Sequence, residues 1–313
     1  MLGGFALMAG LFLLLSACSD RGNKAADESE PANPLLYEIA GSDGDIEGWL
    51  FGTIHALPEG TQWRTAAIES ASERADLLMV EIADLADRKA MAATFRRLAT
   101  TPGLPPLSER IAPSLRGELE SLLDRARVPA GEMASTETWA AALILASAQA
   151  DGDSENGVDR ALIRDFSDRS VREFEGVEAQ LGIFDALSEA DQRDLLREVV
   201  AGSGEFGADP AQLRRAWLAG DEAALIEAAQ TGILADPGLR KALLVQRNEA
   251  WLASILAELE RDTRPFVAVG AAHIVGPDGL ATLLEAEGYS LRRARKSGGD
   301  APPKHLANAR RAL

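Results

Sequence analysis

Short apolar runs near both ends of the chain alternate with amphipathic segments, a pattern typical of an α/β protein. Residues 35–40 and 49–54 are apolar runs of strand length joined by a Gly- and Asp-rich loop, so they predict a β-hairpin. Residues 63–75 have helical periodicity, and residues 77–82 form a buried-strand run that closes on Glu81. Strand, helix and strand in this order predict a βαβ unit.

The middle of the chain, from residue 84 to about 232, has a different pattern. It is rich in Ala, Leu, Arg and Glu, with apolar residues at helical spacing and no fixed repeat. One short strand, 170–174, interrupts the predicted helices. These helices are expected at 87–100, 113–127, 136–149, 158–168, 177–186, 189–201, 211–218 and 222–231.

The C-terminal part returns to the α/β pattern. A long amphipathic helix at 239–259 precedes an apolar strand at 264–269, a helix at 276–287 and a last strand at 289–294. We therefore predict an α/β fold. Its central mixed sheet is built from N- and C-terminal segments, with a large helical insertion at about 84–232.

The first residues look like an export signal. Residues 1–17 contain an apolar run too short to span a bilayer, and it ends in Leu-Ser-Ala before Cys18, the only cysteine of the 313 residues. The segment resembles a bacterial lipoprotein signal peptide, which implies cleavage before Cys18 and attachment of lipid to it. A non-lipidated secretory signal cut near Ala17 is the alternative. Residues 18–34 would form a flexible tether.

The charge distribution bears on partners. The chain has a net charge of −17, which favours solubility and argues against nucleic acid as a partner. Residues 296–313 are basic and lack an apolar face, so they predict a disordered tail. We expect a domain at 35–295 that faces the periplasm and contacts the membrane through its N-terminal lipid. Ser19 after the cysteine favours the outer membrane.

Two segments of the form Gly-x-x-His follow predicted strands. They begin at Gly52 and Gly270 and end at His55 and His273. Ligands of open α/β sheets bind outside the carboxyl ends of the strands, and glycine allows a close approach of the backbone. Each histidine alone could be an ordinary structural residue. The shared context of the domain's only two histidines favours one joint site, since His305 lies in the tail.

Glu81 ends its apolar run and would lie at the same edge of the sheet. A carboxylate entering a buried strand is costly unless it is paired or bound to a cation, although a solvated strand-end Glu is the alternative. Two imidazoles and a carboxylate suit a divalent metal ion with open positions, such as Mn, Co or Zn. The sequence has no His-Glu-x-x-His helix, Gly-x-Ser-x-Gly elbow or phosphate loop. It therefore lacks the usual zinc-protease arrangement, the serine nucleophile of α/β-hydrolases and the phosphate-binding loop of nucleotide hydrolases.

The segments GTIHALPEG (52–60) and GAAHIVGPDG (270–279) resemble the TraB/GumN family, which is related to the Tiki membrane-anchored metalloproteases. The resemblance extends over residues 35–295 and rests in the middle on GVD (157–159), EFEGVEAQL (173–181) and RN (247–248). It implies a Tiki/TraB-like fold. It also implies that His55, Glu81 and His273 are the metal-binding and catalytic set.

The same resemblance adds residues from the middle of the chain. It implies that Glu175 is a second catalytic acid and that the site is lined by Asp159, Gln180, Arg247 and Asn248, beside the two motif glycines. Three of these residues have a plain structural alternative. Asp159 begins a helix, Glu175 ends a strand, and an Arg on a long helix is usually solvated.

These features predict an envelope-anchored, metal-dependent hydrolase of the peptidase type, acting on an exported peptide or another envelope substrate. The metal would activate a water molecule, and Glu81 or Glu175 would move protons. Two alternatives stay open. One is a non-catalytic envelope protein that binds exported peptide or polysaccharide. The other is an esterase-like enzyme that needs no metal and uses a histidine as base.

Overall fold

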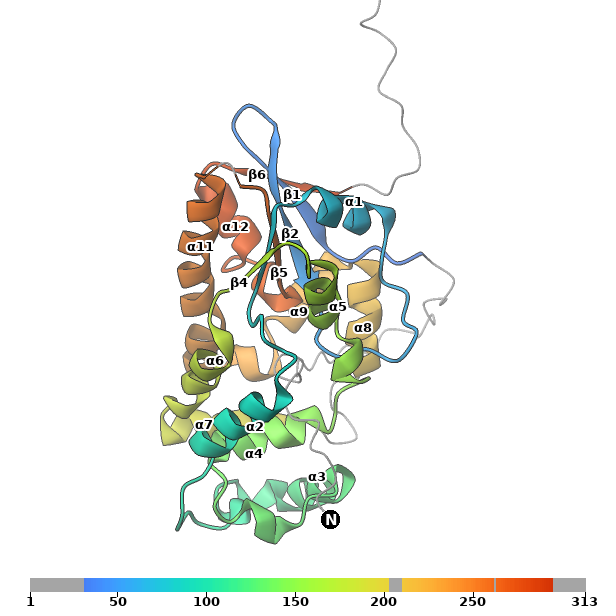
Figure 1. Cartoon of the computed structure of the whole chain (residues 1–313). Coiled ribbons are helices and arrows are strands. Elements are labelled where there is room, and N and C mark those ends of the chain that lie inside the picture. Colours follow the sequence, from blue (N-terminus) through green and yellow to red (C-terminus); the bar gives the residue numbers. More distant parts are fainter. Residues whose placement is uncertain (1–30, 203–209, 262, 295–313) are drawn as a thin grey trace, which may run out of the picture.

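The computed structural model describes residues 31–202, 210–261 and 263–294 (Figure 1). Six strands form one sheet in the order β4-β3-β5-β2-β1-β6. They are β1 (Leu36–Ala40), β2 (Ile46–Thr53), β3 (Leu77–Val80), β4 (Ser170–Glu173), β5 (Pro265–Gly270) and β6 (Ser290–Arg293). The signal peptide, Cys18, most of the tether and the basic tail lie outside the described residues and stay predictions.

The sheet is mixed, as predicted. Strands β2, β5, β3 and β4 are parallel neighbours, whereas β1 pairs antiparallel with both β2 and β6. The predicted hairpin is the β1–β2 pair, and the predicted βαβ unit places β2 and β3 parallel with β5 between them. Strand β4 comes from the middle of the chain. The region predicted as a helical insertion therefore also supplies one edge of the sheet.

The helices cover both faces of the sheet and extend beyond one of its ends (Figure 1). Helices α1 and α5 lie on one face, and α11 and α12 lie on the other. No helix within the described ranges is long and apolar enough to cross a membrane.

The α-helices are α1 (Ala66–Arg74), α2 (Arg88–Leu98), α3 (Arg116–Ala126), α4 (Thr138–Ser147), α5 (Val158–Asp165), α6 (Gly176–Asp185), α7 (Glu189–Ala201), α8 (Pro210–Ala219), α9 (Glu222–Ala228), α10 (Pro237–Arg240), α11 (Gln246–Leu259) and α12 (Leu280–Ala286). Short 3-10 helices are η1 (Leu107–Glu109), η2 (Pro113–Leu115), η3 (Ala130–Met133), η4 (Ser154–Asn156), η5 (Gly232–Ala235) and η7 (Ala271–His273).

Two hydrophobic cores stabilise the fold. The first surrounds the sheet and includes Trp49, Phe51 and Phe266. The second lies among α2, α3, α4, α6 and α7, where Trp139 is wholly buried. Ala272, just after the end of β5, packs against both cores. The carboxyl ends of the parallel strands therefore meet the junction between the sheet and the helical region.

The helix predicted at 239–259 is divided into three parts. A π-helix, η6 (Lys241–Val245), separates α10 from α11. The carbonyl of Leu243 in this π-helix accepts a hydrogen bond from Nη1 of Arg247 at 3.1 Å. Single turns of π-helix are frequent at functional sites. Here the turn leads directly into the residues of α11 that face the strand ends.

Candidate functional site

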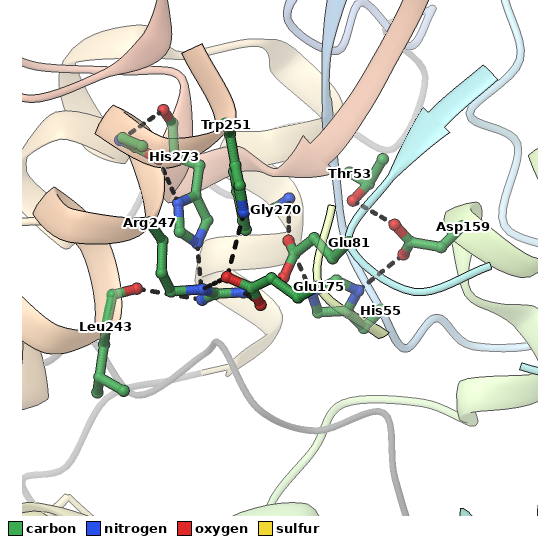
Figure 2. Close-up of polar contacts among 11 residues, drawn as sticks. Thr53, His55, Glu81, Asp159, Glu175, Leu243, Arg247, Trp251, Gly270 and His273 are labelled. Atoms are coloured by element: carbon green, nitrogen blue, oxygen red, sulfur yellow. Dashed lines mark hydrogen bonds and ion pairs between the residues drawn. The ribbon is translucent and has the colours of Figure 1, made fainter. Parts of the chain in front are cut away.

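Each of the four parallel strands brings a polar side chain to the same edge of the sheet (Figure 2). His55 follows β2, Glu81 follows β3, Glu175 follows β4, and His273 lies in η7 directly after β5. Gly270 at the end of β5 lies among them. A Cβ atom on Gly270 would be 3.4 Å from Oε1 of Glu81, 3.5 Å from Nε2 of His55 and 3.7 Å from Cδ2 of His273. The structure therefore brings together the three residues predicted from the strand ends.

A buried carboxylate on α5 orients the His55 ring. Nδ1 of His55 lies 2.7 Å from Oδ2 of Asp159, whose Oδ1 accepts a hydrogen bond from the hydroxyl of Thr53 at 2.8 Å. The first turn of α5 is fixed beside β2, because the amide of Val158 donates to the carbonyl of Ile54 at 3.1 Å. Asp159 thus accepts the Nδ1 hydrogen, and Nε2 of His55 faces the edge of the sheet.

Arg247 joins two acidic side chains across the strand ends. Its Nη2 donates to Oε2 of Glu81 at 2.7 Å and to Oε2 of Glu175 at 3.0 Å, and its Nε donates to Oε1 of Glu175 at 2.8 Å. The other oxygen of Glu81, Oε1, accepts the amide hydrogen of Gly270 at 2.9 Å and lies 4.0 Å from Nε2 of His55. Both oxygens of Glu81 are therefore positioned, one toward Arg247 and one toward His55.

His273 is enclosed by residues of α11. Its Nδ1 lies 2.6 Å from Oδ1 of Asn248, and its Nε2 lies 3.2 Å from Nη1 of Arg247. Its ring packs on Trp251 with the ring centroids 4.4 Å apart, and the indole of Trp251 donates to Oε1 of Glu175 at 3.1 Å. His273 is wholly buried, whereas the side chain of His55 is 17% exposed. Of the two histidines, only His55 is reached by solvent.

The two histidines differ in charge. Burial lowers the pKa of His55, but the charge of Asp159 and its hydrogen bond outweigh burial and raise this pKa to about 9. Burial and the nearby charge of Arg247 lower the pKa of His273 to about 3. Burial raises the pKa of Glu81, but Arg247, the two histidines and the amide of Gly270 together outweigh it, and the net shift is downward. At neutral pH the site therefore has a protonated His55, a neutral His273 and an ionised Glu81.

The charges form an alternating row along the sheet edge. The row runs from Asp159 through His55, Glu81 and Arg247 to Glu175, negative and positive in turn. Because each buried charge lies beside an opposite one, the row offsets part of the cost of removing the charges from water. Neutralising one of these side chains would leave its neighbours as buried charges without an opposite charge beside them.

As arranged, the predicted metal ligands do not fit a shared divalent ion. The guanidinium of Arg247 faces both Oε2 of Glu81 and Nε2 of His273, so a cation already lies between two of the three groups. In the part of the chain that the structure describes, no group of three or more His, Cys, Asp or Glu could hold a metal ion. The metal site stays a prediction from the sequence.

Two residues predicted to line the site, Gly52 and Gln180, make none of the contacts described above. A Cβ on Gly52 would lie 2.9 Å from Cδ1 of Ile274, so this glycine allows close packing of β2 against the segment after η7. Gln180 is buried in α6, and its Oε1 has no hydrogen-bond partner among the described residues. Sequence reasoning missed Thr53 and Trp251. Both lie at short spacings from predicted residues, two before His55 and four after Arg247.

The fold and this cluster together define a class: an α/β protein with a His, Glu and Arg site at the carboxyl ends of four parallel strands. The family model of the TraB/PrgY/gumN family matches residues 35–293, and the chain belongs to this family. Comparison with curated proteins and with solved structures gave no match.

Proposed function

We propose that this protein is a hydrolase of peptide or ester bonds in which His55 and Asp159 form the acid–base pair and water is the nucleophile. The observation that carries the proposal is the 2.7 Å contact between Nδ1 of His55 and Oδ2 of Asp159. A carboxylate behind a histidine fixes its tautomer and directs Nε2 toward a substrate. His55 is also the more exposed histidine, which suits a group that exchanges protons with a substrate.

The chemistry follows from these positions. Neutral His55 accepts a proton from water through Nε2 as the water oxygen bonds to the substrate carbonyl carbon. The protonated ring then donates that proton to the leaving nitrogen or oxygen as its bond to carbon breaks. Oε1 of Glu81, 4.0 Å from Nε2, would orient the same water molecule from the other side. Asp159 stabilises the imidazolium formed between the two steps.

The raised pKa of His55 sets the expected pH dependence. Because this pKa is about 9, most of the protein carries a protonated His55 at neutral pH and lacks the free base. The value of kcat/KM should therefore rise with pH and level off above about 9. A general acid acting in the resting state would give the opposite slope.

The metal-dependent version of the hydrolase remains a second proposal, with Mn, Co or Zn as the ion. It is supported by the pair of groups, Nε2 of His55 and Oε1 of Glu81, that face each other next to Gly270. It requires Arg247 to leave its present position. The two versions differ in one property, the response of turnover to a chelator.

The cellular setting is also a proposal. The N-terminal sequence supports a lipoprotein anchored through Cys18 in the cell envelope, facing the periplasm, with an exported peptide as substrate and without nucleic acid as partner. Metabolic labelling with a radioactive fatty acid tests the anchor. Label should enter the protein and be lost in Cys18→Ser, whereas equal labelling of both would refute lipidation at this residue.

The test of the reaction is turnover of a panel of fluorogenic peptides and aryl esters by the purified protein. The panel is run in EDTA and then with each of the three metals. We expect turnover in EDTA that falls about 100-fold or more in His55→Gln. The variant His305→Gln, which changes the histidine outside the family match, is the matched control and should keep full turnover.

The other outcomes of this assay distinguish the metal-independent hydrolase from its alternatives. Turnover that needs added metal and stops in EDTA would refute the metal-independent mechanism and support the second version. Turnover unchanged in His55→Gln would refute both. Saturable binding of a peptide or polysaccharide without any turnover would support the non-catalytic envelope protein instead.

A further inference from the structure

Arg247 is surrounded by hydrogen-bond acceptors on several sides. Its Nη2 and Nε donate to Glu81 and Glu175, and its Nη1 donates to the carbonyl of Leu243 and faces Nε2 of His273. The side chain is 3% exposed. A planar guanidinium presents several donors in a fixed fork, which this arrangement of acceptors matches and a lysine could not. The predicted ligands Glu81 and His273 therefore both act as acceptors for an internal cation.

The hydrogen bonds around Asn248 fix the tautomer of His273. The Asn248 amide nitrogen lies 3.1 Å from the carbonyl oxygen of His273 and 2.7 Å from that of Asp278, and both carbonyls can only accept. Oδ1 of Asn248 must then face Nδ1 of His273, so Nδ1 carries the hydrogen. Nε2 is left without a hydrogen and can accept from Arg247, which can only donate.

The two Gly-x-x-His motifs therefore differ in role. His55 is backed by a carboxylate and directs Nε2 toward Glu81, whereas His273 is backed by an amide and directs Nε2 toward Arg247. Asn248 cannot stabilise an imidazolium as a carboxylate does. The two motifs are similar in sequence, so this difference in role is not visible from the motifs alone.

We propose that Arg247 is the resident cation of this site and that His273 is a positioning residue, which holds the guanidinium through Nε2 against Glu81 and Glu175. As a result, Arg247 holds Oε2 of Glu81 by a hydrogen bond, and Oε1 of Glu81 stays directed at His55. The proposal does not depend on the reaction, because it concerns hydrogen bonds that exist in the resting protein.

The direct test is nitrogen NMR of the full chain labelled with 15N-histidine. The variants His55→Gln and His305→Gln assign the three rings. We expect His273 to have a protonated Nδ1 and an unprotonated Nε2 in EDTA at pH 7, with both signals unchanged by one equivalent of Zn²⁺. A hydrogen on Nε2, a doubly protonated ring, or a Zn²⁺-dependent shift of Nε2 at 1:1 stoichiometry would each overturn the proposal.

A matched pair of substitutions adds a second readout, the Nε–H proton signal of Arg247. His273→Gln retains an oxygen acceptor at the place of Nε2, whereas His273→Phe keeps a ring against Trp251 but offers no acceptor. We expect a sharp Arg247 signal in wild type and His273→Gln, and a broadened signal in His273→Phe. Equal signals in the two variants would refute the positioning role. Failure of the hydrolase proposal would leave these signals unchanged, so the two proposals fail separately.

Discussion

The substitution Asp159→Asn removes the charge that raises the pKa of His55 while keeping the shape of the side chain. Without that charge, burial should bring the pKa of His55 from about 9 down toward its ordinary 6.5 or below. The difference between 6.5 and 9 corresponds to about 3 kcal/mol of folding free energy, since one pKa unit is about 1.4 kcal/mol. The wild-type protein should show this contribution and the variant should not.

The sign of the effect fixes the pH window. The pKa of His55 is higher in the folded than in the unfolded chain, so its stabilisation is fully present below pH 6.5 and is lost as pH rises to about 9. The lowered pKa of Asp159 acts in a different window, because its stabilisation is lost only as pH falls into the acid range.

Urea denaturation of both proteins at several pH values between 6 and 9.5 measures the contribution. The difference in free energy of unfolding between wild type and Asp159→Asn should shrink by about 3 kcal/mol across this range. Subtracting the two curves cancels other titrating groups, including His305. Parallel curves for the two proteins would refute the ion pair between His55 and Asp159.

Three further substitutions probe the packing around the site. Gly270→Ala should have an almost unchanged Tm, because the added Cβ meets its neighbours only at ordinary contact distances. It should still lower kcat/KM by about 10-fold or more, because the methyl group occupies the space between the two histidines. A wild-type kcat/KM would contradict this. Gly157→Ala places a Cβ 2.3 Å from the carbonyl oxygen of His55. Urea denaturation should therefore show a free energy of unfolding lower by about 1–3 kcal/mol. Wild-type stability would contradict this close approach of Gly157 to His55. Trp251→Phe keeps an aromatic ring but removes the hydrogen bond to Glu175 and some buried volume. It should cost at least about 1 kcal/mol in the same assay, and no loss would argue against that bond.

The strand-end part of the site could be predicted from the sequence. Parallel strands finish at one edge, so residues directly after apolar runs must lie together there. This reasoning placed His55, Glu81 and His273 in one cluster without any side-chain information. The helical middle was also predictable, because its apolar residues recur at helical spacing.

The part of the site supplied by helices could not be predicted in this way. Arg247 lies on an amphipathic helix, where the pattern alone favours a solvated arginine, and its burial depends on the π-helix and on two carboxylates distant in sequence. Asp159 is 104 residues from His55, so only the resemblance pointed to it. The charge contrast between the two histidines depends on Asp159, which raises the pKa of His55, and on burial beside Arg247, which lowers that of His273. No local spacing in the sequence reveals either pairing.

The pH dependence of kcat/KM in EDTA tests the central claim most directly. With a substrate from the panel, kcat/KM should rise between pH 6 and 9 and level off above about 9, and this rise should move to lower pH in Asp159→Asn. A value that falls through this range, or a rise that stays in place in the variant, would contradict the assignment of His55 and Asp159 as the acid–base pair.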